Sequence, residues 1–366
     1  MQGKQNPFAS FFAGGFESAT HRRPDRLQVD VIHSTHHDLR AEADYRLLQQ
    51  AGIFTVRDGL RWHLIERQPG LYDWSSFLPM LHASTAAGTQ VIWDLCHWGI
   101  PPDLDLLSPE FVERFAAFAH AAASLVAKHT SAVPFFCAIN EISFWSWIGG
   151  DVGAFYPYEK GKGDTLKRQL VRASLAAIDA VRSVAPNARF LQPEPLINIV
   201  ANPAKPEHRA DAERHTAAQY HVWNWLAEDP AIDGLDVIGI NYYWNNQWIH
   251  EDERTPPGHL LHRPLHEMLF EAWNRYRRPL FLSETGAEEP ATAGWLAYVC
   301  AEVRKAQRMG AEILGICLYP VMDYPGWDDH RHCSCGIVEL DSQWQQRTLR
   351  RPLVEELRCQ RTLFSR

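Results

Sequence analysis

The sequence predicts an α/β protein folded as one (β/α)8 (TIM) barrel over residues 1–366. Eight apolar runs of strand length recur along the chain, and a helical segment follows nearly every one of them. This alternation is typical of a parallel sheet, and eight repeats favour a closed barrel over an open doubly wound sheet. A length of 366 residues also allows two domains, but α/β barrels with insertions reach this size and no linker or low-complexity segment marks a boundary.

In the N-terminal half, the expected strands are the apolar runs 10–16, 53–56, 90–98 and 135–141. The helices expected between them cover 38–51, 73–87 and about 109–129. Gly52 and Gly88 follow the first two helices, and glycine suits a helix end because it readily adopts the left-handed backbone conformation. The third helix is expected to begin at Ser108, with a hydroxyl cap and Pro109 in the first turn.

In the C-terminal half, strands are expected at 188–194, 235–243, 279–284 and 312–319, each again an apolar run. Helices are expected at about 164–185, 210–228, 264–276 and 291–309. Asp164 is expected to cap the first of these helices. Pro186 prevents its continuation, because proline has no backbone N–H to donate.

Composition excludes several classes of partner. The 36 basic and 44 acidic residues give a net charge of −8, which argues against a nucleic-acid or anionic-membrane partner because both bind basic surfaces. No stretch resembles a signal peptide or is long enough for a membrane helix. The seven cysteines are odd in number and scattered, as expected of reduced thiols, with Cys96, Cys137 and Cys317 in the core. We expect a cytoplasmic protein; the sequence does not indicate its oligomeric state.

The candidate site consists of the polar residues that end the apolar runs, because a barrel of this kind carries its active site at the carboxyl ends of its strands. These residues are Glu17, Arg57, His97, Asn140, Glu141, Glu194, Asn241, Tyr243 and Glu284. Glu141 and Glu284 follow the fourth and seventh strands and can face each other across the barrel mouth. Such a pair suits glycoside hydrolysis, in which one carboxyl protonates the leaving oxygen while the other, about 5–5.5 Å away in retaining enzymes, attacks the anomeric carbon.

The neighbours of the two glutamates fit this chemistry. Asn140 could hydrogen-bond a sugar 2-hydroxyl, and Arg57 would favour the charged form of Glu284. Structural alternatives are a solvated surface position for either glutamate, a buried core histidine at His97, and a purely structural ion pair between Arg57 and Asp58. For Glu194, a loop carboxylate is favoured over a catalytic role.

These motifs resemble those of family 1 β-glycosidases, and the resemblance spans nearly the whole chain in the right order. VRDGLRW, CHWGIP, INEI, GINYY and SETG are similar to successive strand-end motifs of that family, although Ile142 stands where the family has proline. The resemblance implies that Glu284 is the nucleophile and Glu141 the acid/base, with Arg57 hydrogen-bonded to the nucleophile. It further implies that His97 binds a sugar hydroxyl and that Asn241 and Tyr243 serve the site.

Two departures from the family concern the substrate. Glu17 stands where the family has a glutamine that reads sugar hydroxyls, and Gly326 precedes Trp327 where the family has a glutamate that grips the outer hydroxyls. The resemblance therefore implies no preference for glucose or galactose. The chain is also shorter than typical members, which implies trimmed loops and an altered aglycone side.

Aromatic and metal-type residues give weaker signals. Sugar stacking and structural packing are equally open for the tryptophans at or beyond strand ends, which are Trp62, Trp98, Trp145, Trp147, Trp244, Trp248 and Trp327; the resemblance favours Trp327. The cluster His330, His332, Cys333 and Cys335 matches no standard zinc spacing, so no metal is expected. Neither a dinucleotide-binding nor a P-loop glycine pattern occurs.

The sequence thus predicts a retaining β-glycoside hydrolase that acts on a carbohydrate without a cofactor. A transglycosylase using the same two glutamates is the alternative. A barrel that binds a saccharide or partner protein without turnover is the alternative from another class.

Overall fold

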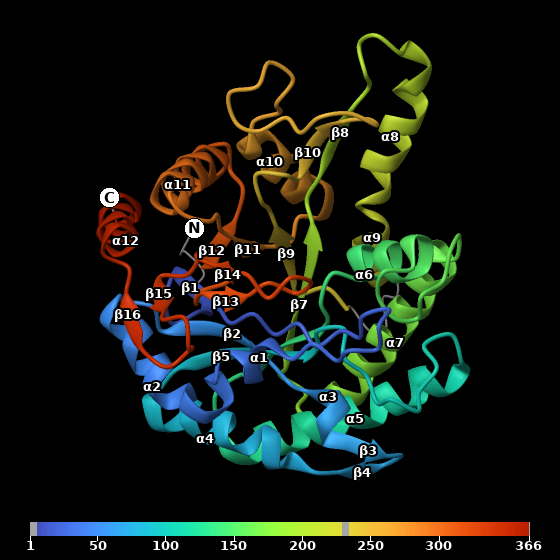
Figure 1. The fold of residues 1–366 in the computed structure, drawn as a ribbon, viewed down its shortest axis with the longest axis vertical. Helices are drawn as coiled ribbons and strands as arrows, with labels where there is room; N and C mark the ends of the chain where they lie inside the picture. The colour runs from blue at the N-terminus through green and yellow to red at the C-terminus, as the bar shows by residue number, and fades with distance from the viewer. Residues whose placement is uncertain (1–5, 229–233, 366) are drawn as a thin grey trace.

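Eight parallel strands close into a barrel in the computed structural model, which describes residues 6–228 and 234–365 (Figure 1). Around the ring the order is β1, β12, β11, β9, β7, β6, β5 and β2. The strands are β1 Phe12–Gly15, β2 Thr55–Gly59, β5 Gln90–Cys96, β6 Phe135–Ile139, β7 Arg189–Pro195, β9 Val237–Asn241, β11 Leu280–Thr285 and β12 Ile313–Leu318. Each lies within or beside one of the eight apolar runs, so the predicted (β/α)8 barrel is confirmed.

Helices surround the barrel in the order that the sequence predicts (Figure 1). The larger ones are α2 His37–Gln50, α4 Leu78–Ala87, α5 Pro109–His129, α7 Gly163–Val184, α8 Arg209–Ala218, α9 His221–Ala227, α10 Leu265–Tyr276, α11 Thr292–Arg308 and α12 Arg351–Phe364. The expected helix 210–228 is divided into α8 and α9, and α12 was not predicted. Gly88 ends α4 in the left-handed conformation, with φ of 65°, as expected.

Two expected helix caps are wrong. The hydroxyl of Ser108 donates to the carbonyl of Asp105 instead of accepting a bond from α5. Asp164 lies inside α7, whose first residue, Gly163, donates its N–H to the Asp151 carboxylate at 2.8 Å. A carboxylate brought by an earlier loop thus replaces the local cap, a contact that no local pattern predicts.

The barrel interior is closed at the end where the strands begin. Phe8 packs its ring 5.0 Å from that of Phe135 and 4.8 Å from that of Phe281. A separate inner cluster continues from these residues and includes Ala13, Ile92, Leu191, Val237, Leu314 and Cys317. Apolar side chains thus fill most of this end, where Thr55 donates a hydrogen bond to Gln90 at 2.9 Å, and the charged residues of the site lie at the other end.

Short elements are added around the barrel mouth. β8 Asn198–Val200 and β10 Gln247–Ile249 pair in parallel and, with α8, project beyond the barrel (Figure 1). α6 Ile142–Trp147 begins directly after Glu141. The remaining elements are α1 Val31–Ser34, α3 Trp62–Ile65, β3 Glu66–Gln68, β4 Leu71–Tyr72, η1 Trp74–Ser76, η2 Ile148–Val152, η3 Pro206–His208, β13 Tyr324–Pro325, β14 His332–Cys333, β15 Val338–Leu340 and β16 Arg347–Leu349.

Two further features concern the described residues alone. None of the helices among the described residues has the length and apolar character needed to cross a bilayer. All the cysteines lie among the described residues, and all are free thiols. Cys96, Cys137 and Cys317 are buried, as the sequence predicts.

Candidate active site

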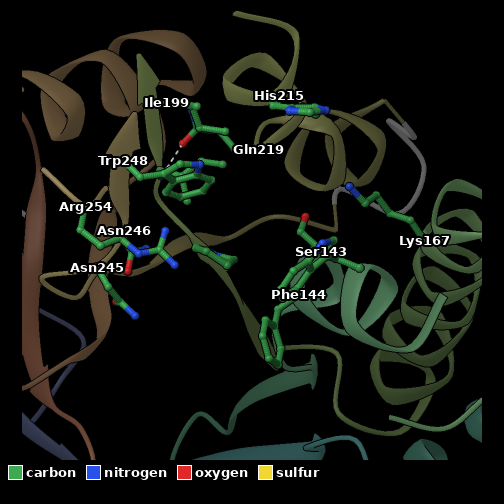
Figure 2. A pocket seen from close by; sticks show the side chains of 14 residues that line it. Ser143, Phe144, Lys167, Ile199, His215, Gln219, Asn245, Asn246, Trp248 and Arg254 are labelled. Atoms are coloured by element: carbon green, nitrogen blue, oxygen red, sulfur yellow. Dashed lines mark hydrogen bonds between the residues drawn. The ribbon is translucent and has the colours of Figure 1, made fainter. Parts of the chain in front are cut away.

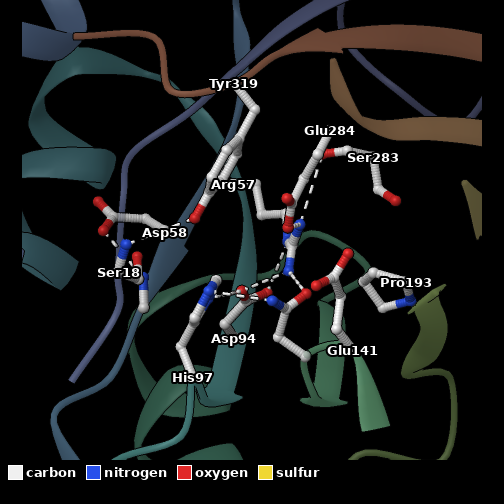
Figure 3. Close-up of polar contacts among 12 residues, drawn as sticks. Ser18, Arg57, Asp58, Asp94, His97, Glu141, Pro193, Ser283, Glu284 and Tyr319 are labelled. Atoms are coloured by element: carbon white, nitrogen blue, oxygen red, sulfur yellow. Dashed lines mark hydrogen bonds and ion pairs between the residues drawn. The ribbon is translucent and has the colours of Figure 1, made fainter. Parts of the chain in front are cut away.

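Glu284 lies in β11 and is held by one donor from β2 and one from the loop after β9. The Arg57 guanidinium of β2 donates through Nη1 to Glu284 Oε1 at 2.7 Å (Figure 3). The Tyr243 hydroxyl donates to Oε2 at 2.9 Å. Burial and the negative charge of Glu284 raise the pKa of Tyr243 well above its usual value. The phenol therefore stays neutral and keeps its proton for this hydrogen bond.

Arg57 is buried, and its remaining hydrogen bonds go to Asp94 of β5, to Asn140 just after β6 and, at 3.4 Å, to the Ser283 carbonyl of β11. Its Nε and Nη2 donate to the two oxygens of Asp94 at 2.9 and 2.7 Å, and Nη2 also donates to Asn140 Oδ1 at 2.5 Å. Burial alone would raise the pKa of Asp94, but the Arg57 charge and the hydrogen bond with His97 outweigh it, so that pKa is lowered. Arg57 is therefore a fixed positive centre between two carboxylates.

His97 continues this network. Its Nδ1 lies 3.1 Å from Asp94 Oδ2, and its Nε2 lies 3.0 Å from Asn140 Nδ2. An amide N–H can only donate, so the arrangement fits an imidazole protonated at Nδ1. His97 is thus buried with both ring nitrogens in contact with polar groups of this network, an environment that the alternative of a buried core histidine also allows.

Glu141 follows β6 in a left-handed backbone conformation, with φ of 43° and ψ of 62°. This conformation is strained for a residue with a Cβ and is enriched at functional sites. The Glu141 N–H donates to the Pro193 carbonyl at 3.2 Å, while the preceding N–H of Asn140 donates to the Cys96 carbonyl at 3.0 Å. The two neighbouring strands thus fix the backbone at this turn.

The two glutamates share one space at the barrel mouth, and their carboxyl groups turn towards each other in Figure 3. Asn241 connects them, because it is the Cα partner of Glu284 in the β9–β11 ladder and donates from Nδ2 to Glu141 Oε1 at 2.9 Å. The Ser283 hydroxyl donates to Asn241 Oδ1 at 2.7 Å and so fixes the orientation of the amide. Asn241 therefore links the Glu141 carboxyl group to the strand position beside Glu284.

The electrostatic surroundings of Glu141 favour its protonated form. Burial raises the pKa of Glu141 well above its usual value, and the charge of Glu284 raises it further. The hydrogen bond from the neutral Asn241 amide opposes this only in part. The site thus contains a carboxyl group that keeps its proton beside one that is paired with a guanidinium.

Glu17 places a third carboxyl group near these two. Its Oε1 accepts bonds from the Ala19 N–H at 2.9 Å and the Tyr319 hydroxyl at 3.3 Å, and lies 3.8 Å from His97 Nε2. Burial raises its pKa, with a further contribution from the charge of Glu284. The side chain thus belongs to the same buried polar group as the pair.

Trp327 lies in an aromatic group beside the polar network. Its ring centroid is 5.3 Å from that of Trp98 and 5.4 Å from the imidazole of His21. His21 stacks on Phe155 at 3.7 Å, and burial lowers the pKa of the imidazole to about 3. Nε1 of Trp327 and both His21 ring nitrogens are buried without a hydrogen-bond partner among the described residues.

The other tryptophans divide between packing and exposed positions. Trp62 and Trp145 are fully buried, and Trp62 packs against the phenylalanines of α5, so the structural reading holds for both. Trp147 and Trp244 are more than half exposed. Trp98 belongs to the aromatic group around Trp327.

Two further alternatives are resolved by the contacts. Arg57 pairs with Asp94 and Glu284, whereas Asp58 accepts bonds from His37 and Tyr45, so the proposed Arg57–Asp58 pair is wrong. The His330–Cys335 segment does not gather into a metal site. In the described part of the chain, no group of His, Cys, Asp and Glu side chains has the arrangement to hold a metal ion.

The sequence reading missed Asp94 and Tyr319. Asp94 is a charged residue inside the apolar run 90–98, a position where a buried partner is required, and this signal was available. Tyr319 ends the eighth run, and its ring lies 5.6 Å from the Arg57 guanidinium. The same criterion of polar residues at strand ends would have included it.

Glu194 is not the loop carboxylate that the sequence suggested. It lies in β7, is fully buried, and accepts the backbone N–H groups of Ile142 and Ser143 at 2.8 and 3.0 Å. Gln192 donates to it at 2.9 Å. Glu194 therefore caps α6 immediately after Glu141 and positions the Glu141 turn.

We expect Glu194→Gln to lower the free energy of unfolding by about 2 kcal/mol. The glutamine amide has one acceptor oxygen instead of two, and its NH2 group would face one of the three N–H donors that now bind the carboxylate. Urea unfolding measures the change, and Glu207→Gln, at an exposed position, is the matched control. An unfolding free energy equal to that of the control would contradict the capping role.

Comparison with known proteins agrees with the barrel. The hyperthermophilic β-glucosidase from Pyrococcus furiosus superposes with a TM-score of 0.79 at 16% identity, covering 99% of this chain and 96% of that one. The β-glycosidase from the hyperthermophile Thermosphaera aggregans gives 0.78 at 16% identity, with coverages of 99% and 97%. The family 1 β-glucosidase from Thermotoga maritima gives 0.74 at 15% identity, with coverages of 88% and 86%.

These comparisons define the class of fold. No protein-family model matches the sequence, and no curated protein matches it. The chain has the closed (β/α)8 barrel of the family 1 β-glucosidases, as the resemblance implied. Because identity is about one residue in six with these structures, the likeness extends to the fold, and function depends on the site itself.

Proposed function

We propose that the protein is a retaining β-glycoside hydrolase with Glu284 as nucleophile and Glu141 as acid/base. The observation that carries the proposal is the unequal environment of two neighbouring glutamates. Glu284 accepts bonds from a guanidinium and a phenol, whereas burial raises the pKa of Glu141 and its side chain accepts a bond from a neutral amide. Paired carboxyl groups whose environments differ in this way suit the separate roles of acid and nucleophile.

In the first step of this mechanism, a Glu284 oxygen attacks the anomeric carbon while Glu141 gives its proton to the leaving-group oxygen, and the glycosidic bond breaks. In the second step, Glu141 takes a proton from water and the resulting hydroxide displaces Glu284 from the sugar. The two carboxyl groups supply all the proton and nucleophile chemistry, so we propose that no cofactor takes part.

We assign sugar binding to the polar residues around this pair. Asn140 Nδ2 has a second N–H that can reach a 2-hydroxyl, since only one is used on His97. Glu17, His97, Asn241 and Tyr243 lie in the same network. Trp327 offers a flat face of the kind that stacks on sugar C–H groups.

The test is trapping with a panel of 2-fluoro β-glycosides, followed by mass spectrometry of peptic fragments. We expect one glycoside to label Glu284 and so to identify both the nucleophile and the accepted sugar. A label on another carboxylate would overturn the assignment of Glu284. No label and no turnover of any aryl β-glycoside above a Glu284→Ala control would favour a barrel that binds a saccharide or partner protein.

The destabilising effect of the site on the folded protein argues against a barrel that only binds. A buried carboxyl in a strained backbone conformation, close to a second carboxyl, destabilises the folded protein. Catalysis gives a reason to retain it, whereas binding alone does not. Transglycosylation needs the same residues and an acceptor sugar in place of water, and the ratio of transfer to hydrolysis products with added acceptor distinguishes the two reactions.

The raised pKa of Glu141 predicts a specific pH dependence. Protonated Glu141 is needed for departure of a poor leaving group, so kcat/KM should fall as pH rises through this pKa. We expect Glu141→Gln to lower kcat/KM about 10³-fold for a phenyl β-glycoside but much less for a dinitrophenyl β-glycoside, whose leaving group needs no proton. The variant should also lose the basic limb of the profile. Equal losses for both substrates would contradict the role of Glu141 as acid.

A further inference from the structure

A cavity of about 540 Å³ lies at the barrel mouth on the Glu141 side (Figure 2). Its lining residues come just after the catalytic strands: Ser143 and Phe144 follow Glu141, Pro195 and Ile197 follow Glu194, and Asn245 and Asn246 follow Tyr243. The volume matches that of small-molecule sites in proteins. Arg57 and Asp94 lie elsewhere, in the polar network around Glu284, so this cavity is distinct from that network.

The position of the cavity relates it to the leaving group. In the proposed mechanism, Glu141 donates its proton to the leaving-group oxygen, so the aglycone must extend from the sugar past Glu141. α6 begins with Ile142 and carries Ser143 and Phe144 into the cavity lining. The cavity is therefore where a leaving group would lie.

The walls fit a flat apolar group. Phe144 and Trp147 come from α6, while Trp248 of β10 faces from the small sheet above the barrel, where it pairs in register with Ile199 of β8. Aromatic side chains of this kind offer large contact area to a ring.

The charges in the cavity are of one sign. Lys167 and Arg254 contribute a cation each, on opposite sides of the cavity in Figure 2, and none of the described lining residues is acidic. The Arg254 guanidinium lies 5.1 Å from the centre of the Trp248 ring. Neither cation forms an ion pair with a described residue.

Lys167 is the more informative of the two. Its side chain extends from the second turn of α7 towards the cavity (Figure 2), and burial lowers the pKa of its ammonium, although Glu194, Asp164 and Asp151 oppose this from a distance. A partly buried ammonium that lacks a direct partner is costly, and an anion in the cavity would relieve the cost.

We propose that this cavity is the leaving-group subsite and that it selects an anionic aglycone, a flat ring that carries a carboxylate, through Lys167 and Arg254. The inference rests on the proposed function for the role of Glu141. It goes further in naming the charge of the substrate and two residues that determine specificity.

The test compares 4-carboxyphenyl and 4-carbamoylphenyl β-glycosides of the sugar that the trapping panel identifies. The amide is the neutral isostere of the carboxylate. We expect kcat/KM to favour the carboxylate about tenfold at low salt, mostly through KM, since a charge-assisted hydrogen bond contributes this much. Lys167→Met and Arg254→Gln should each reduce the preference, and 1 M salt should weaken it. Lys128→Met, at an exposed position at the end of α5, is the matched control and should leave it unchanged.

A second measurement does not depend on turnover. Calorimetric titration with free 4-hydroxybenzoate and 4-hydroxybenzamide should show tighter binding of the anion to the wild type, and equal binding to the Lys167→Met, Arg254→Gln double variant. If neither glycoside is hydrolysed but the anion binds selectively, the proposed function fails and the charge selectivity of the cavity stands. If both glycosides are hydrolysed without preference and the titrations are equal, the anionic aglycone is excluded and the hydrolase remains.

Discussion

Replacing Glu284 by alanine is expected to lower kcat on aryl β-glycosides by about 10⁵-fold, the order of loss that follows removal of a covalent nucleophile. The reason is that Glu284 would form the covalent bond to the sugar, whereas Arg57 and Tyr243 donate hydrogen bonds to its carboxylate. Steady-state kinetics on the sugar identified by trapping measure the loss.

Azide is expected to restore activity differently to the two glutamate variants, which provides the control. In Glu284→Ala, azide would take the place of the nucleophile and give an α-glycosyl azide. In Glu141→Ala, azide would attack the intact glycosyl-enzyme and give a β-glycosyl azide. Product configuration by nuclear magnetic resonance identifies each role, and a β product from Glu284→Ala would reverse the assignment.

Replacing Arg57 by methionine is expected to lower the free energy of unfolding by about 3–5 kcal/mol, because removing one partner of a buried ion pair leaves an uncompensated charge. Arg57 and Asp94 are each 1% exposed, and Glu284 is 5% exposed. The variant would also misplace Glu284 and so reduce kcat. Urea unfolding measures the stability, and kinetics on the same preparation measure the catalytic loss.

Two companion variants separate charge from packing. Arg57→Met with Asp94→Asn should regain part of the lost stability, because the amide carries no charge to be compensated. Arg168→Met removes an exposed pair with Asp164 and should change stability by no more than about 0.5 kcal/mol. A loss in Arg57→Met as small as that in Arg168→Met would mean that the buried pair does not stabilise the fold.

Much of the candidate site could be predicted because the barrel places strand ends together. Glu141, Asn140, Asn241 and Glu284 each follow or end an apolar run, and a parallel barrel brings such positions to one face. The structure brings them into one hydrogen-bonded group. Their catalytic roles stay predictions until the trapping and the azide products are measured.

Asp94 and Glu194 show why the rest could not be predicted. Both are acids in or at the end of an apolar run, but their roles depend on their partners. Asp94 binds a guanidinium from the neighbouring strand, and Glu194 binds N–H groups of the turn after another strand. These contacts join residues 37 and 52 positions apart, and no local pattern records them.

The sequence by itself determined the eight barrel strands, their order, most of the helices between them and the residues at the strand ends, because apolar periodicity and helix breakers act over a few neighbouring residues. Only the tertiary structure decided which side chains meet. It paired Arg57 with both Asp94 and Glu284, placed Glu141 beside a neutral amide, and left Lys167 facing a cavity without an acid among its described lining residues. The reason is that hydrogen bonds, desolvation and charge pairing depend on distances in space, and these are set by closure of the barrel.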